Sequence, residues 1–423
     1  PCEAHPHAGV ELASGGLFMV GDSMCYDDRQ HKNKTPAKRT QFAVKTSVDN
    51  AEDWSVDLGD FGYNYGKNAV QLGDGSLLIV GITNTEADNH LHRSVTRLDV
   101  NTGDVLSLTV LPHIEDLDGG LDGWNGVDLC SCDESGMSVW VSGFVDGEGD
   151  PADEDAMFFC AGVSTASVLR FGDGGDDPEV VFTKVFDGDE DGFITPQGTR
   201  IVDTGCSGEG VDTAILINTV IPTTDVEARY QFAGISLSAP SFDDIEEDDD
   251  VSVNWRKIFL AGDDANAPAE DYDNTMGHPY EMVSDGGDGV VVTGHAFDFK
   301  ETAEVHNPIG RLLRVNGDGE ALWDFRFRPE DAPNDHNVEC YGVAPSLDGG
   351  FVATCGYGCM GCDPTLGEEN KVWQVLNQKV DIGGEGVYIE LYTDTSLGNI
   401  VGLREGGYAI LVDATSWGDP GTG

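Results

Sequence analysis

Short apolar segments, each preceded by a turn that contains glycine, recur along the whole chain. One of them is the run Leu77-Leu78-Ile79-Val80, which follows Asp74-Gly75-Ser76. Apolar runs of this length between turn residues are typical of buried β-strands. No segment keeps a 3.6-residue hydrophobic period, so the sequence predicts an all-β chain with few helices.

Seven of these turns are spaced almost regularly. With the second residue of each turn as its anchor, successive anchors are 59, 61, 74, 79, 61 and 57 residues apart: Gly16, Gly75, Gly136, Gly210, Gly289, Gly350 and Gly407. A further glycine follows five of the anchors after five to seven residues: Gly21, Gly81, Gly143, Gly294 and Gly356. A period near 60 residues, stretched by two insertions, indicates a repeat architecture.

Two more strands are expected between successive anchors. Residues 311–327 read as a strand, an Asn-Gly-Asp-Gly turn and a second strand, and residues 93–110 repeat this pattern. Tryptophan marks the last strand of three units, at Trp54, Trp255 and Trp323. Four strands per unit, seven times over, predict a seven-bladed β-propeller with about four antiparallel strands per blade.

The segments Asp348–Ala353 and Val315–Trp323 resemble the repeats of secreted, quinoprotein-like seven-bladed propellers. The resemblance implies the fold and identifies no catalytic residue. We expect one propeller domain over residues 1–415 and a linker-like tail over 416–423, where Gly and Pro are frequent. The last unit supplies two strands where the others have four, so the last blade is expected to be incomplete. Its open edge could receive a strand from a neighbouring chain, or the remaining strands could lie beyond residue 423.

The charge balance excludes one class of partner. Asp and Glu number 77 against 23 Lys and Arg, which gives a formal net charge of −54. A protein with this charge lacks the basic surface that nucleic-acid binding requires. No apolar run approaches the ~18 residues of a membrane-spanning helix, so direct membrane insertion is not expected either.

Ten cysteines and the glycosylation sequon at Asn33 favour an extracellular or cell-surface location with disulfides. The cysteines whose spacing suggests a pairing are Cys340 with Cys355 across a hairpin, Cys2 with Cys25, and Cys359 with Cys362. Three connectivities remain open for the other four: Cys130, Cys132, Cys160 and Cys206. The spacing of Cys355, Cys359 and Cys362 also fits an iron–sulfur cluster, but the all-β setting favours disulfides.

The best local motif is an acidic loop that begins at Asp187. Carboxylates at Asp187, Asp189 and Asp191, followed by Gly192 and the carbonyl of Phe193, match the first positions of a calcium-binding loop. The twelfth position is glycine instead of the bidentate glutamate of an EF-hand. We therefore expect a Ca²⁺-binding loop without a regulatory EF-hand; the alternative is an acidic turn between blades.

Histidines are expected to gather on one face of the propeller, in loops that lead into innermost strands or connect second and third strands. A metal or polar-ligand site could form there from His7, Trp124, His278 and His336. The alternative is that histidines collect in loops simply because they are rare in buried strands.

No nucleophile elbow, phosphate-binding loop or organic-cofactor motif occurs in the sequence. The sequence therefore favours a non-enzymatic structural or adhesive module, stabilised by disulfides and calcium, whose partners are other subunits or an extracellular polymer. One alternative is a glycan- or ligand-binding propeller that uses its histidine- and aromatic-bearing face. Another is an enzyme with a metal at the mouth of the propeller channel.

Calcium binding would stabilise the folded chain, because a ligand that binds only the native state shifts unfolding to higher temperature. We expect the thermal midpoint to rise when millimolar calcium replaces a chelator at constant ionic strength. Differential scanning calorimetry in the two buffers checks this, and an unchanged midpoint would remove calcium from the interpretation.

Overall fold

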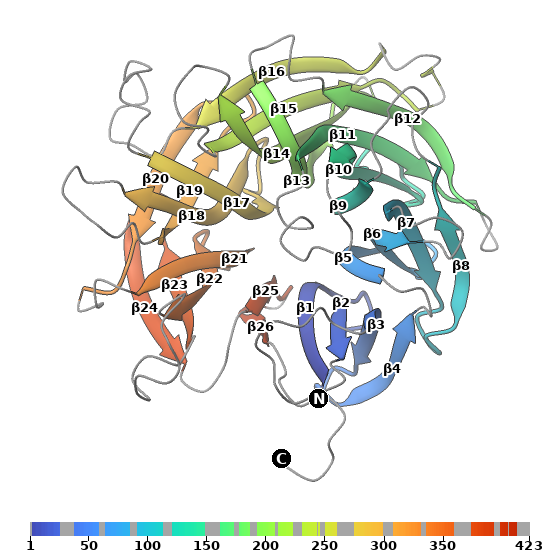
Figure 1. Cartoon of the computed structure of the whole chain (residues 1–423), viewed down its shortest axis with the longest axis horizontal. Coiled ribbons are helices and arrows are strands. Elements are labelled where there is room, and N and C mark those ends of the chain that lie inside the picture. Colours follow the sequence, from blue (N-terminus) through green and yellow to red (C-terminus); the bar gives the residue numbers. More distant parts are fainter. Residues whose placement is uncertain are drawn as a thin grey trace.

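The computed structural model shows antiparallel β-sheets arranged around a common axis, with the innermost strand of each sheet toward the centre (Figure 1). The structure describes residues 2–25, 38–58, 64–84, 91–112, 121–148, 161–172, 177–186, 193–207, 210–222, 231–242, 244–245, 250–259, 275–298, 308–330, 336–358, 374–392, 398–404 and 406–412. Within these residues no helix is long and apolar enough to cross a membrane.

Six blades contain four strands each, in chain order from the axis outward. Blades 1 and 2 are β1 (Cys2–Glu11), β2 (Leu17–Cys25), β3 (Lys38–Thr46) and β4 (Glu52–Leu58), then β5 (Asn64–Gln71), β6 (Leu77–Asn84), β7 (Leu91–Leu98) and β8 (Val105–Val110). Blades 3 and 4 are β9 (Leu121–Leu129), β10 (Ser138–Glu148), β11 (Ala161–Arg170) and β12 (Glu179–Phe186), then β13 (Phe193–Cys206), β14 (Asp212–Pro222), β15 (Gln231–Ala239) and β16 (Ser252–Phe259). Blades 5 and 6 are β17 (Thr275–Ser284), β18 (Val290–Asp298), β19 (Pro308–Val315) and β20 (Ala321–Phe327), then β21 (Asn337–Pro345), β22 (Phe351–Gly358), β23 (Gln374–Val380) and β24 (Gly386–Tyr392).

The seventh repeat forms only a hairpin of β25 (Gly398–Gly402) and β26 (Tyr408–Val412) between blades 6 and 1. Val401 and Leu411 pack on Leu17 of blade 1, and Ile400 packs on Ala344 of blade 6. The prediction of seven blades is therefore corrected to six complete blades. The repeat in the sequence marks the turn between the first and second strands of each unit. The last hairpin contains this turn, so it was counted as a blade although it has only two strands.

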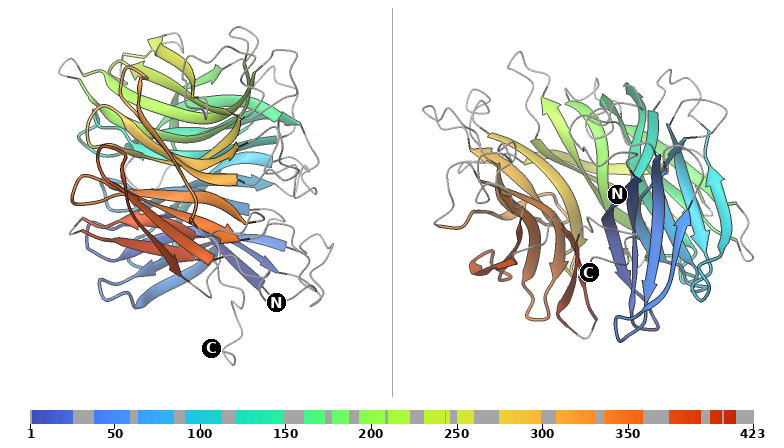
Figure 2. Two further views of the ribbon diagram at one scale, coloured as in Figure 1. Left: turned by 90° about the vertical axis from the view of Figure 1, so that its left-hand side faces the viewer. Right: turned by 60° about the horizontal axis from the view of Figure 1, so that its bottom comes forward.

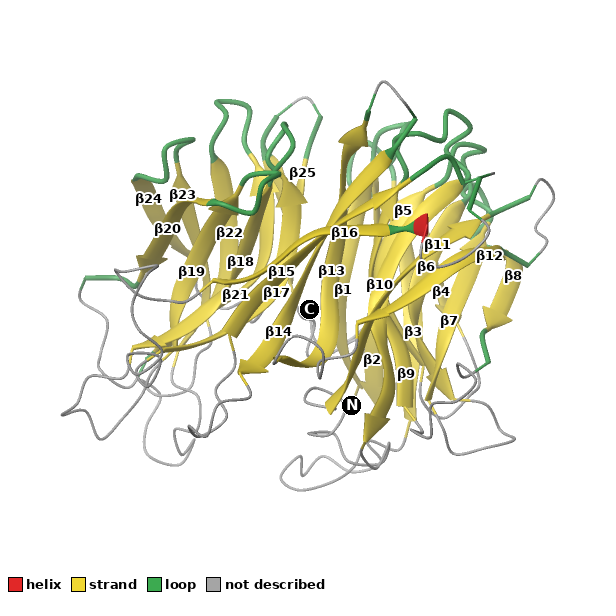
Figure 3. Ribbon diagram, turned by 90° about the horizontal axis from the view of Figure 1, so that it is seen from above, coloured by secondary structure: helices red, strands yellow, loops and turns green. Residues whose placement is uncertain are grey.

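All seven anchor glycines lie in or beside the turn that joins the first two strands of their unit. Gly75 and Gly136, for example, have φ of 88° and 66°, which other residues adopt only with strain. These turns, and the turns between third and fourth strands, lie at the same end of the molecule (Figure 3). The sheets pack face to face around the axis (Figure 2). Two large hydrophobic clusters combine neighbouring blades, one from blades 4 and 5 and one from blades 5 and 6.

The three predicted tryptophans join neighbouring blades. Each lies on a fourth strand and donates its indole N–H to a carbonyl in the next blade's outer turn, from Trp54 to Val100 at 3.1 Å, Trp255 to Gly317 at 2.6 Å, and Trp323 to Ile382 at 3.1 Å. A glycine with positive φ lies under each ring: Gly103, Gly319 and Gly384. One hydrogen bond and one aromatic contact thus recur at three blade boundaries.

Arg311 shows how the few basic residues are used. Its side chain is fully buried, forms two hydrogen bonds of 3.0 and 2.9 Å with Asp324, and donates a third to the Phe259 carbonyl at 3.1 Å. The guanidinium also lies 4.3 Å from the centre of the Phe232 ring in blade 4. A buried cation is tolerated here because it is both paired and hydrogen-bonded.

Two disulfides lie within the described residues. Cys340–Cys355 connects β21 to β22, as the sequence predicts, and Cys132–Cys206 connects blade 3 to blade 4. Cys130 is buried and forms no disulfide. Cys2 and Cys25 are register partners in β1 and β2, but their side chains are outside the description. Cys160, Cys359, Cys362 and the sequon at Asn33 also lie outside the described residues.

Replacing Gly319 by alanine tests the tryptophan contacts. A Cβ there would lie 2.7 Å from the Trp255 ring, whereas Gly286 in the same blade has open space and a similar φ, 82° against 72°. Alanine causes similar backbone strain at the two positions. The difference between the two variants in free energy of unfolding therefore measures the effect of the contact with Trp255. We expect Gly319→Ala to lower the free energy of unfolding by about 1–3 kcal/mol more than Gly286→Ala, measured by urea denaturation. Equal losses in the two variants would show that the Trp255 contact contributes nothing.

Candidate functional site

The innermost strands of all six blades contain a β-bulge at an equivalent position. In each of them one residue has no partner on the second strand: His7, Lys67, Asn125, Thr199, Tyr280 and Tyr341. We call these six residues the axial ring. A bulge gives the bulged strand an additional residue and redirects side chains, and bulges are frequent next to binding sites. Six bulges at one level therefore mark the axis as the candidate functional site.

Glycines of the second strands make the bulges possible. Gly21, Gly81, Gly143 and Gly294 each lie so close to a carbonyl oxygen of the first strand that a Cβ would collide with it. These are four of the glycines that follow the anchors in the sequence. Blade 6 has Cys355 at this position, opposite Cys340, so a disulfide lies where four of the other blades have a glycine.

Contacts between blades show that members of the ring converge. The Tyr280 and Tyr341 rings, from blades 5 and 6, are 4.8 Å apart between centroids. His7 forms a short contact through Nε2 with Asp22 and interacts electrostatically with Lys67 of blade 2. The ring therefore combines aromatic, imidazole, ammonium and amide groups around one axis.

A polar network crosses the axis beside the ring. Arg200 of β13 donates to the Asn125 carbonyl of blade 3 and, at 2.8 Å, to Glu281 of blade 5. Asn399 of β25 donates to the His7 carbonyl at 2.5 Å and approaches Glu281 at 3.5 Å. Five innermost strands are thereby connected, and the hairpin is fixed to blades 1 and 5.

Histidine, tyrosine and a buried glutamate gather where blades 5 and 6 meet. His278 stacks on Tyr280 at 6.4 Å between ring centroids and lies 5.1 Å from its register partner His295. Glu339, which is 3% exposed, accepts a 2.5 Å hydrogen bond from the Tyr341 hydroxyl through Oε2. Its other oxygen, Oε1, is buried and has no hydrogen-bond partner.

Burial is the main cause of the pKa shifts of the side chains where blades 5 and 6 meet. It lowers the pKa of His278 to about 4, and burial together with nearby His278 lowers the pKa of His295 well below its usual value. Burial and, to a smaller extent, Glu339 raise the pKa of Tyr280. The pKa of Glu339 is also raised by burial, against the opposing effect of the Tyr341 hydrogen bond. Near neutral pH both histidines are uncharged and Tyr280 keeps its proton.

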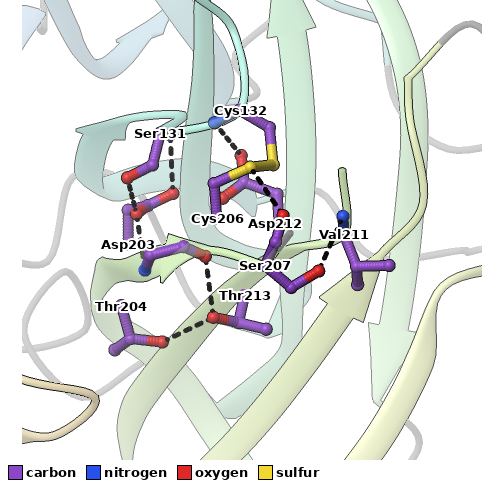
Figure 4. Close-up of a disulfide and its surroundings, with 10 residues drawn as sticks. Ser131, Cys132, Asp203, Thr204, Cys206, Ser207, Val211, Asp212 and Thr213 are labelled. Carbon is purple, nitrogen blue, oxygen red and sulfur yellow. Dashed lines mark hydrogen bonds between the residues drawn. A yellow bond between two sulfur atoms is a disulfide. The ribbon is translucent and has the colours of Figure 1, made fainter. Parts of the chain in front are cut away.

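A second cluster of titratable groups lies beside the Cys132–Cys206 disulfide and includes Asp203 and Asp212 (Figure 4). Asp128, which contacts Asp203, completes it. The Asp203 carboxylate accepts from the Ser131 hydroxyl and backbone N–H, and its own N–H donates to Asp128 at 3.0 Å. Asp212 is fully buried, accepts from the Cys132 N–H at 3.4 Å, and lies within hydrogen-bond reach of the Asp203 carboxyl.

Two of these carboxyl groups, Asp128 and Asp212, hold protons at unusually high pH. Burial is the main cause that raises the pKa of Asp128 to about 7, with Asp203 adding to it. Burial and the hydrogen bond with Asp203 raise the pKa of Asp212 to about 8. This cluster is at a boundary between blades and its carboxylates accept from backbone N–H groups, so we assign it a structural role.

The structure separates the four residues of the predicted ligand face. His7 belongs to the axial ring, and His278 lies next to ring residue Tyr280. His336 packs its ring edge-on against Tyr357 at 5.1 Å. Trp124 is fully buried in the core, with the Arg93 guanidinium 5.6 Å from its ring, and does not reach a ligand surface.

Metal binding remains a prediction. Within the described ranges no three His, Cys, Asp or Glu side chains are arranged to hold a metal ion. Asp187, Asp189 and Asp191 of the predicted calcium loop lie outside the described residues. Phe193 begins β13, but its side chain is outside the description.

Sequence reasoning did not single out Lys67, Tyr280, Glu339 or Tyr341 as site residues. For Lys67 and Tyr280, the signal that could have located them was present in Gly81 and Gly294, two of the glycines that follow the anchors. Each such glycine permits a bulge in the preceding strand, so counting back across the turn would have pointed to the bulged residues.

Comparison with known proteins leaves the family undetermined. No family model matches the sequence, and no curated protein matches it either. A hydrazine synthase structure from Kuenenia stuttgartiensis is similar in fold, with a TM-score of 0.51 and 12% identity over 97% of this chain and 96% of that one. An α-L-arabinanase from Penicillium chrysogenum, complexed with arabinobiose, covers 90% of this chain and 93% of its own, with a TM-score of 0.44 and 13% identity. At these identities the likeness shows the β-propeller fold alone.

Asp212→Asn tests the raised carboxyl pKa. A carboxyl whose folded pKa exceeds its unfolded value of about 4 stabilises the fold fully below pH 4. That stabilisation is lost as the pH rises through about 8. We expect the variant to melt at least about 2 °C above the wild type at pH 8.5, and close to it at pH 5, by calorimetry.

Asp348→Asn is the matched control for this prediction. Lys379 and the Gly350 N–H lower the pKa of Asp348 to about 2, so its contribution is lost only when the pH falls toward 2. Its effect should be the same at pH 5 and pH 8.5. If the difference in melting temperature between the wild type and Asp212→Asn is the same at pH 5 and pH 8.5, the prediction is wrong.

Proposed function

We propose that the chain is an extracellular propeller that binds a small polar molecule at the axial ring. The observation that carries this proposal is the set of six bulges, which brings polar and aromatic residues of different blades to one level on the axis. Repeating a bulge in every blade interrupts six strand pairs. Interruptions of regular strand pairing are frequent next to active and binding sites.

The side chains of the ring suit a polar ligand. Tyr280 and Tyr341 offer aromatic faces, Lys67 an ammonium group and Asn125 an amide. The Asp22 carboxylate contacts His7, and the Glu339 carboxyl group accepts a hydrogen bond from Tyr341. Binding sites for small molecules combine apolar faces with a few fixed polar groups in this way. Disulfides in the structure are compatible with secretion.

A second candidate function is a structural or adhesive module that joins other subunits or an extracellular polymer. One feature favours it: the outer edge of β26 pairs with no strand of the described chain, and its residues Tyr408–Val412 are mostly apolar. An edge of this kind can accept a strand from a neighbouring chain. Calcium would stabilise such a module through the loop that begins at Asp187.

A thermal-shift screen of sugars, polyols, amines and amino acids tests the first candidate. We expect at least one compound class to raise the melting temperature, and its affinity to fall about fivefold in Tyr341→Phe and in Lys67→Met, because each substitution removes one polar contact. Tyr388→Phe and Lys45→Met change the same residue types on outer strands and should bind like the wild type.

Two results would count against ring binding. One is a set of hits whose affinity is equal in ring variants and controls. The other is the absence of hits together with a calcium-dependent rise in the light-scattering mass, which would favour the second candidate.

A further inference from the structure

The carboxyl group of Glu339 is the most unusual polar group near the axial ring. It is almost completely buried, and only one of its two oxygens is satisfied, by the Tyr341 hydroxyl. A buried oxygen without a hydrogen-bond partner is destabilising, because it has lost its contacts with water. A bound molecule that donates to Glu339 Oε1 would remove this destabilisation.

Aromatic rings lie on the blade 5 side of the same carboxyl group. Tyr280 contacts the rings of Tyr341, His278 and His295 at centroid distances of 4.8, 6.4 and 5.4 Å. Tyrosine rings attract cations through their faces, most strongly where water is excluded. An aromatic group next to an unsatisfied carboxylate is the usual recognition element for an ammonium group.

Among the described residues, no cation is found among the groups that act on the Glu339 carboxyl. From blade 5, Tyr280 interacts with Glu339; the titratable groups beside Tyr280 are the uncharged His278 and His295 and Glu281, which is paired with Arg200. From its own blade Glu339 is faced by Tyr341 and His336. The net charge of −54 adds a field that concentrates cations at the molecule.

We propose that the side chains around Glu339, Tyr280 and Tyr341 bind a cationic ligand, an amine or a quaternary ammonium group. This inference rests on the proposed function of the axial ring and specifies the ligand class. The cation would lie against the tyrosine rings and pair with Glu339. Lys67 and His7, which lie in blades 2 and 1, then complete the other part of the ring.

The proposal has a specific dependence on pH. A cation binds better to ionised Glu339 than to the neutral acid, so its affinity should rise as the pH increases through the pKa of this group. A quaternary ammonium ligand has no proton of its own to lose. Any such dependence that disappears in Glu339→Gln therefore belongs to Glu339.

Choline and its neutral analogue 3,3-dimethyl-1-butanol are matched probes, because they differ only in the charged nitrogen. Isothermal titration calorimetry of the full chain measures the affinity of both probes. The buffer contains about 0.3 M salt, which screens the surface charges. We expect choline to bind at least about tenfold more tightly than the alcohol, and about tenfold less tightly to Glu339→Gln than to the wild type. Glu385→Gln, an exposed glutamate in the β23–β24 turn of the same blade, should leave the affinity unchanged.

The outcomes separate this inference from the proposed function. Equal choline binding to wild type and Glu339→Gln, or equal binding of the two probes, would overturn the cationic ligand. If a neutral sugar or polyol then binds and is lost in Tyr341→Phe or Lys67→Met, the axial ring stays the binding site. If ring variants alter the binding of no probe, both proposals are wrong. Circular dichroism of Glu339→Gln confirms that the variant is folded.

Discussion

The close contact between a carbonyl oxygen of the first strand and a glycine of the second is the constraint on which the axis depends. Any side chain at Gly21, Gly81, Gly143 or Gly294 would push the two strands apart at the bulge. The bulged residue would then lose its place at the axis, and with it the contacts between blades. Blade 4 keeps the same backbone geometry with the glycine moved to the opposite strand, where Gly198 pairs with Asn218. Different sequences thus reach one geometry, because the requirement is for space at one point of the strand pair.

The excess of acidic residues shapes the interior as well as the surface. Basic residues are too few to balance it, and those with a structural role are placed inside: Arg311 pairs with Asp324 within blade 5 and donates to the Phe259 carbonyl of blade 4, and Arg200 connects three innermost strands at the axis. At Asp128 and Asp212 a bound proton neutralises the buried carboxyl group instead, because burial and the neighbouring Asp203 raise the pKa of both. The structure therefore responds to its charge in two ways, by burying paired arginines and by keeping selected carboxyl groups protonated. Both depend on neighbours from adjacent blades, so the blades are electrostatically as well as hydrophobically connected.

Much of the fold could be predicted from the sequence, because turns and apolar strands are local features. The anchor glycines, the tryptophans of the fourth strands and the pair Cys340–Cys355 are all found where their spacing places them. The two strands of the last unit were also predicted, but the count of seven blades was wrong, because the last hairpin repeats the anchor and omits the outer strands. The site was harder still. His7 was recognised from its residue type, but Tyr341 and Glu339 gain their meaning from a bulge and from blade 5, and neither is visible in a local pattern. Trp124 shows the converse, since an aromatic residue in a promising position is occupied entirely by core packing.

Blade 6 differs from the others at the point that matters most for the axis. Tyr341 directly follows Cys340, and the bond from Cys340 to Cys355 takes the place that a glycine has in four other blades. Glycine permits the bulge whatever the surroundings of the protein, whereas two cysteines hold it covalently only after they have been oxidised. The β21–β22 strand pair beside Glu339 is therefore fixed by a covalent bond that forms by oxidation, a reaction that reducing compartments do not support. Five of the six bulges thus depend on glycine alone, whereas the sixth also depends on the oxidation of two cysteines.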